Sequence, residues 1–190
     1  MIIKRIAALC KAAKNIILLD CDDGTQWVGD GKGFYQLVGM PELGEQSICA
    51  VMDIPQEKAA EMEITRREMP EYYNPEKEGG MGLGEYLEFD DGNCITFMGN
   101  TLMPVKNRDG IRFIQPKYLK PLGDLDNITL ENGAGGRFLI ANDGMFPVGV
   151  ILVEPVGGKI VSWLAEVSTA ARTEELEKKR RERDDDDDNI

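Results

Sequence analysis

The sequence predicts an α+β protein in which short helices cover one face of antiparallel sheets. Runs of β-branched and aliphatic residues are separated by Asp-Gly and Asn-Gly pairs, which favour tight hairpin turns. Pro55 and Pro116 open helical patterns, and the first helical turn tolerates proline because an N–H there would lack a partner. A similar order of elements recurs at intervals of about 45 to 60 residues, which indicates internal repetition.

Residues 110–155 show this order most completely. The expected elements, in chain order, are a strand at 111–114, a helix at 116–122 and strands at 127–131, 137–141 and 148–153. The unit therefore reads strand, helix, strand, strand, strand.

The N-terminal residues form a shorter version of the same unit. An amphipathic helix is predicted at 2–14, because Ile2, Ile6 and Leu9 recur on one side of it. Strands are expected after this helix at 16–21, 25–28 and 34–38. Because the leading strand is missing, another segment or another chain must supply the partner for the exposed sheet edge.

The middle of the chain, residues 46–105, yields the second unit in chain order. Its expected elements are a strand at 47–53, a helix at 55–62 and strands at 63–68, 85–89 and 93–98. The helix carries Glu57 and Glu61 beside Lys58, which makes it a poor element to face DNA. A loop at 69–83, rich in Gly, Pro and Glu, is long enough to contact a partner.

Four parts follow from these patterns. The first part, residues 1–105, contains two units, and the second, residues 106–156, is a third unit. The other two parts are a C-terminal helix in 157–183 and an acidic tail in 184–190. Ile160 and Trp163 begin a helical apolar pattern after Gly157-Gly158. The tail is a run of aspartates, and such a run is expected to be solvated and disordered.

The chain contains no histidine, which removes the commonest general base and metal ligand. Carboxylate or lysine chemistry stays open as an alternative, but no spacing points to it, so we expect a protein that is not an enzyme. Cys10, Cys21, Cys49 and Cys94 show no C-x-x-C spacing, and we expect four free thiols, no metal and no cofactor.

Two turns invite comparison with ligand-binding loops. The acidic stretch 20–24 has its glycine fifth, whereas a calcium-binding EF-hand loop has it sixth and ends in glutamate. The stretch 29–33 lacks the Lys-Ser/Thr ending of a phosphate-binding loop. Both are interpreted as hairpin turns.

No apolar run approaches the roughly 20 residues that a membrane-spanning helix needs. Lys11 and Lys14 interrupt any apolar segment of a signal peptide. We therefore expect a cytoplasmic protein without membrane contact.

The net charge of −12 is unevenly distributed. Residues 1–19 and 106–120 each carry +4, which leaves −20 for the rest of the chain. Basic faces on an acidic protein suit contact with nucleic acid phosphates. The candidate DNA-binding residues are Lys4, Lys11, Lys14, Arg112, Lys117 and Lys120. The alternative interpretation is that these cations are ordinary solvated helix faces.

The run FIQPKYLKPL at 113–122 and the run VILVEP at 150–155, with three strands between helix and end, resemble the repeating half-domain of DNA sliding clamps of the polymerase III beta-subunit type. The resemblance spans residues 1–155. It implies repeated units of clamp-like fold, a ring that encircles duplex DNA without sequence preference, and homo-oligomerisation. It also implies polymerase or other replication proteins as partners, and the small size suggests a phage or prophage processivity factor. The alternatives are a protein-binding adaptor, or a DNA-mimic regulator, of the same fold without DNA binding.

Overall fold

The computed structural model describes residues 3–75, 88–89, 94–107, 110–160, 162–163 and 166. The chain divides into a compact unit from Met1 to Glu154 and a second unit from Pro155 to Ile190. In the second unit, residues 158–160, 162–163 and 166 are helical. The rest of the predicted C-terminal helix, the acidic tail and most of the loop at 69–83 lie outside the described residues.

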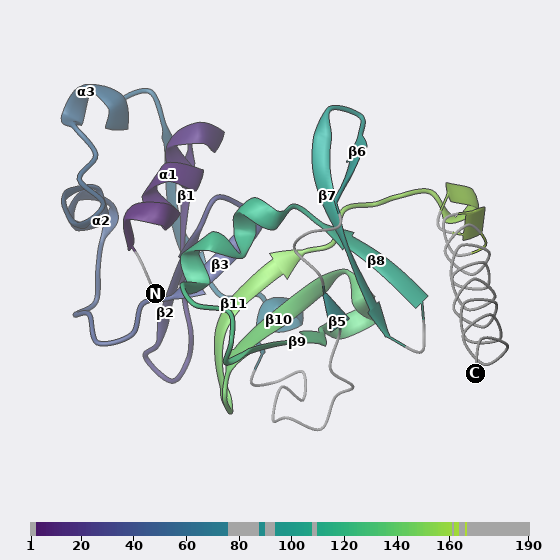
Figure 1. Ribbon diagram of the computed structural model, residues 1–190. Helices are drawn as coiled ribbons and strands as arrows, with labels where there is room; N and C mark the ends of the chain where they lie inside the picture. The colour runs from purple at the N-terminus through teal and green to yellow at the C-terminus, as the bar shows by residue number, and fades with distance from the viewer. Residues whose placement is uncertain are drawn as a thin grey trace, which may run out of the picture. The chain divides into compact units, whose positions relative to one another are not determined.

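A seven-stranded mixed sheet forms the body of the first unit (Figure 1). Its strands, in chain order, are β1 (Asn15–Asp20), β2 (Gln26–Gly29), β3 (Gly33–Gln36), β4 (Glu63–Glu68), β9 (Ile128–Asn132), β10 (Phe138–Asp143) and β11 (Phe146–Leu152). Their order across the sheet is β4-β1-β2-β3-β11-β10-β9. Neighbours pair antiparallel, except that β1 and β4 run parallel.

In a smaller antiparallel sheet, one long strand, β7 (Asn100–Asn107), pairs with each of the other strands. The strands that pair with β7 are β5 (Glu88–Phe89), β6 (Ile95–Phe97) and β8 (Gly110–Ile114). The protein is thus α+β, with one large mixed sheet and one small antiparallel sheet.

The helical elements are short. They are α1 (Ile3–Ala13), α2 (Glu45–Val51), α3 (Gln56–Ala59) and the 3-10 turns η1 (Glu71–Tyr73), η2 (Pro116–Tyr118), η3 (Lys120–Leu122) and η4 (Ala134–Gly136). Among the described residues, none of these helices is both long and apolar enough to cross a membrane.

Strand β4 supplies the edge that the N-terminal unit lacks. Residues Glu63 to Glu68 pair with Asn15 to Asp20 in one continuous parallel register. The expectation of a purely antiparallel sheet is therefore wrong for this pair. A parallel pair needs a long crossover, and α2 and α3 lie between β3 and β4 in the chain.

The large sheet has two halves, β4-β1-β2-β3 and β11-β10-β9. They meet where β3 pairs with β11, with Tyr35 opposite Gly149. Each half has the order helix or 3-10 turns, strand, strand, strand. One face of the sheet carries Leu18, Tyr35 and Leu139 and packs against α1 and the turns η2 and η3. The opposite face carries Trp27 and Phe34 in a second, smaller cluster.

The expected repetition of three clamp-like units is not confirmed. The predicted second unit, residues 46–105, is divided between the two sheets, since β4 joins β1 whereas β5, β6 and β7 belong to the small sheet. The strand predicted at 47–53 is wrong: α2 occupies most of this segment. Ile48 and Met52, four residues apart, are both buried, which is the spacing of a helix face.

The helix predicted at 116–122 consists of two successive 3-10 turns. Pro121 lacks the N–H that a continuous α-helix would use there. Gly123 then turns the chain away with a φ of 90°, a conformation that favours glycine. The predicted helix at 2–14 is confirmed as α1, whereas only Gln56–Ala59 of the segment 55–62 is α-helical.

Candidate functional site

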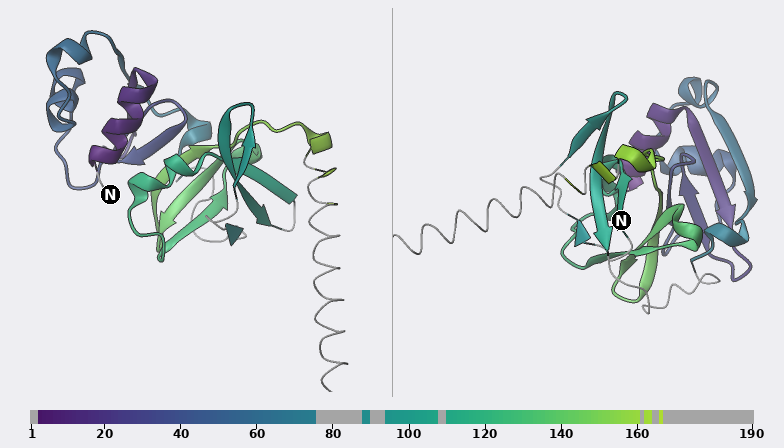
Figure 2. Two further views of the ribbon diagram at one scale, coloured as in Figure 1. Left: turned by 45° about the horizontal axis from the view of Figure 1, so that its top comes forward. Right: turned by 90° about the vertical axis from the view of Figure 1, so that its right-hand side faces the viewer.

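A basic face forms where α1 and η3 lie side by side (Figure 2). The Arg5 guanidinium donates a hydrogen bond from Nη1 to the backbone carbonyl of Lys120, at 2.6 Å. The two residues are 115 positions apart in the chain. This contact joins two basic segments that the sequence could only describe separately.

Lys4 on α1, Lys117 on η2 and Lys120 on η3 are exposed. Within the described part of the chain, none of the three forms an ion pair. The Lys117 ammonium lies 5.0 Å from the ring centroid of Tyr118, a cation–π contact that steadies it beside η2. Because α1 and the segment 116–122 contain no Asp or Glu, neither segment itself contributes a carboxylate to this face.

The other three candidate residues make contacts away from this face. Lys11 donates to the backbone carbonyl of Asp53 at 3.0 Å, and Lys14 pairs with Glu61 at 3.3 Å. The side chains of Lys14 and Glu61 are both about two-thirds exposed, and such a pair contributes little to stability. Arg112 donates from Nη1 to the Gly136 carbonyl at 3.0 Å.

A buried hydrogen-bond network of Asp30, Tyr35 and Tyr118 lies beneath the basic face. Tyr118 donates to Asp30 Oδ2 at 3.0 Å, and Tyr35 donates to the Tyr118 carbonyl at 2.6 Å. Burial and then the Asp30 charge raise the pKa of both tyrosines, so both phenols remain donors. Burial also raises the pKa of Cys10 to about 12, which makes this thiol inert. The network fixes structure and offers no nucleophile.

A small pocket of about 270 Å³ opens between α1 and η2. Lys117 lines this pocket together with Lys32 and Asn100. Neither Lys32 nor Asn100 was among the candidate residues from the sequence. Lys32 pairs with Glu154 at 2.7 Å, which offsets its charge. Only the pairing of β3 with β11 brings Lys32 near this site, so no local pattern could have indicated it.

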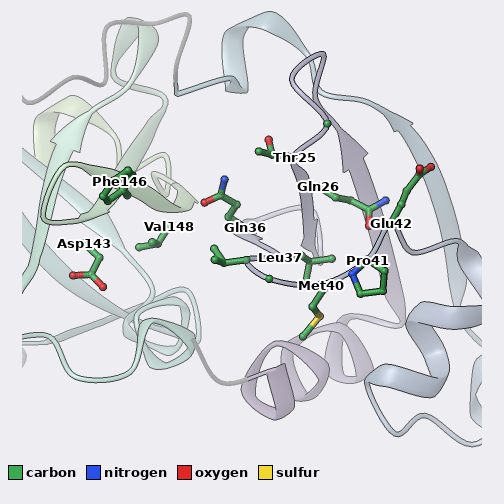
Figure 3. A pocket seen from close by; sticks show the side chains of 13 residues that line it. Thr25, Gln26, Gln36, Leu37, Met40, Pro41, Glu42, Asp143, Phe146 and Val148 are labelled. Atoms are coloured by element: carbon green, nitrogen blue, oxygen red, sulfur yellow. The ribbon is translucent and has the colours of Figure 1, made fainter.

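A second feature is an open groove of about 740 Å³ between the two halves of the large sheet. Figure 3 shows Asp143, Phe146 and Val148 on one side, and Thr25, Met40, Pro41 and Glu42 on the other, with Gln36 and Leu37 between them. The main apolar lining residues are Leu37, Val38, Met40, Pro41, Phe146 and Val148.

Gln26 holds one wall of the groove in place. Its side-chain amide donates to the Leu43 carbonyl at 2.9 Å and accepts from the Leu43 N–H at 3.0 Å. The same amide nitrogen donates to Asp20 at 2.7 Å, and Arg66 bridges Asp20 and Glu42. The segment from Val38 to Glu42 is therefore anchored at its C-terminal end.

Within the described ranges, no group of three His, Cys, Asp or Glu residues is placed to hold a metal ion. Both surfaces are suited to binding, the first to anions and the second to apolar groups. No protein-family model, no curated protein and no solved structure matches the chain.

Proposed function

We propose that this protein is a non-catalytic accessory protein that binds duplex DNA without sequence preference, in the manner of a clamp-like processivity factor. The hydrogen bond between Arg5 and Lys120 carries the proposal, because it unites the two acid-free basic elements in one face. Lys4, Lys117 and Lys120 supply its exposed charges.

The interaction is electrostatic. Lysine and arginine side chains displace the counterions that surround the phosphates, which gives affinity that depends on salt and not on base sequence. The net charge of the remaining chain is strongly negative, so the rest of the surface repels DNA and orients the basic face toward it. The resemblance to sliding clamps and the helix-strand-strand-strand order in both halves of the sheet support the clamp-like interpretation.

The experiment is a salt titration of binding to linear and circular duplex DNA of unrelated sequences. The test variant replaces Lys4, Lys117 and Lys120 together with Glu. The matched control replaces Lys58, Arg67 and Lys159, which are also exposed, with the same change of net charge. We expect the test variant to lose binding while the control retains most of it. Each phosphate contact that is lost should reduce the slope of log K against log salt by about 0.9.

Equal affinity of the two variants for DNA would show that the basic face is not the DNA-binding surface. Failure of the wild-type chain to bind either DNA would favour the DNA-mimic or adaptor alternative. Sedimentation of the wild-type chain tests the ring, because a ring requires a mass that is a multiple of 21.1 kDa. A second candidate function, that of a protein-binding adaptor, is favoured by the apolar groove.

A further inference from the structure

The groove lies at a place where the large sheet divides. The ladder between β3 and β11 ends at Tyr35 and Gly149. Beyond this point β3 continues with β2, since Gln36 pairs with Trp27 and the Leu37 N–H donates to the Gln26 carbonyl at 2.7 Å. On the other side, β11 continues with β10, where Phe146 lies opposite Asp143.

We propose that this groove binds an extended peptide of a partner protein that carries bulky apolar side chains and a lysine or arginine. Two strand continuations part here, and within the described residues no backbone hydrogen bond joins Leu37 or Val38 to residues 146–148. Backbone groups left open at a strand edge are suited to pairing with an added extended segment.

The side chains that line the groove determine the apolar part of the specificity. Val38 is 65% exposed and Phe146 is 74% exposed, which is costly for large apolar groups that remain in water. Leu37 and Val148 connect these exposed side chains to the core. The groove volume of about 740 Å³ lies in the range of about 300 to 1,000 Å³ of sites that bury most of a small ligand.

The charges of the groove determine the basic part of the specificity. Asp143 is exposed at its rim and, in the described part of the protein, has no ion-pair partner. Glu42, on the opposite wall, is paired with Arg66. Because the lining residues include no lysine or arginine, the groove favours a cationic occupant over an acidic one. The inference does not depend on DNA binding, since its residues are separate from the basic face.

The test selects binders from a displayed library of random nine-residue peptides on the full-length chain. We expect the selected peptides to combine alternating aliphatic or aromatic residues with lysine or arginine. The resynthesised peptides should bind Val38→Asp and Phe146→Asp at least about tenfold more weakly than wild type. The matched control is Met98→Asp, because Met98 is 85% exposed in a turn outside the groove.

A charge variant tests the second element of the specificity. Asp143→Lys should weaken binding of the basic peptides about tenfold, whereas Asp126→Lys, an equal charge change at an exposed site outside the groove, should not. The inference is overturned by a selection that enriches nothing or enriches acidic peptides, and by peptides that bind the groove variants and wild type equally. It is also overturned if the chain dimerises in solution and Phe146→Asp makes it monomeric, because a second copy then occupies the groove.

Discussion

Tyr118 and Asp30, 88 positions apart in the chain, are joined by a buried hydrogen bond of 3.0 Å. Asp30 lies in the turn between β2 and β3, and its other carboxylate oxygen accepts from the N–H groups of Lys32 and Gly33. Tyr118 belongs to η2 in the second half of the sheet. This bond therefore connects the two halves beneath the basic face, and it makes the position of η2 dependent on a carboxylate far away in the sequence.

Removing the Tyr118 hydroxyl should destabilise the protein more than removing that of Tyr35. Tyr118→Phe leaves a buried carboxylate without one of its donors, and a hydrogen bond to a charged group contributes about 1.5 to 3 kcal/mol. Tyr35→Phe loses only a bond to a carbonyl, which contributes about 1 kcal/mol. Urea unfolding of both variants measures the difference. An equal loss in both would contradict this difference between the two hydrogen bonds.

Gly33→Ala should disturb the same region by crowding. A methyl group at Gly33 would lie 2.7 Å from the Tyr118 ring and 2.8 Å from the Tyr35 hydroxyl, closer than such atoms normally approach. Overpacking of this kind costs about 1 to 3 kcal/mol. Thermal unfolding should show the loss, whereas Gly157→Ala, where the methyl would meet no atom within 4 Å, serves as the control. Unchanged stability of Gly33→Ala would show that Tyr118 moves freely.

Lowering the pH should reduce the stability of the fold by protonating Asp20, which helps to hold one wall of the groove. Burial alone would raise its pKa, but hydrogen bonds from Arg66 and Gln26 and the charge of Arg66 outweigh that effect and lower the pKa. The ionised form therefore stabilises the fold above the unfolded pKa of about 3.9, and this stabilisation is lost as the pH falls through the folded pKa. Wild type and Asp20→Asn should differ most in urea midpoint near neutral pH and converge in acid. A constant gap would rule out this linkage.

Glu131 should show the opposite dependence on pH. It is 3% exposed, and within the described part of the chain its Oε1 has no hydrogen-bond partner. Burial raises its pKa, and a hydrogen bond with Asn142 offsets this only in part. Stability from the protonated form is complete below the unfolded pKa of about 4.3 and is lost as pH rises through the folded pKa. Glu131→Gln should therefore be more stable than wild type at pH 7, with the advantage disappearing near pH 4.

The four thiols should differ in reactivity. The Cys10 thiol is buried, whereas Cys94 is exposed. A thiol reagent at pH 8 should modify Cys94 rapidly in the folded protein and Cys10 only after unfolding, because the raised pKa of Cys10 leaves almost no thiolate. Titration in denaturant should find four groups. Fewer than four would show a disulfide or a bound metal.

Several local elements followed from the sequence alone. The apolar period of residues 2–14 predicts α1, and the Asp-Gly pairs predict the turns before β2 and between β10 and β11. The strand at 63–68 was predicted with its observed bounds. These predictions succeed because helix period and turn chemistry depend on residues within a few positions of one another.

The pairing of the strands, and the choice between helix and strand for short apolar segments, required the tertiary structure. A short apolar segment such as 47–53 fits strand or helix, and burial of Ile48 and Met52 against the core decided for helix. The parallel pairing of β1 with β4, and the pairing of β3 with β11, depend on long-range burial that no local pattern specifies.

The same distinction applies to the two surfaces. The sequence alone identified two basic segments by composition, but only the packing of α1 beside η3 placed Arg5 against Lys120 and turned Lys11 and Lys14 toward Asp53 and Glu61. The groove could not be predicted, because it arises where two non-adjacent strands separate after pairing over three residues. Its position is set by which strands meet in the folded sheet, and that choice minimises exposed apolar surface over the whole unit.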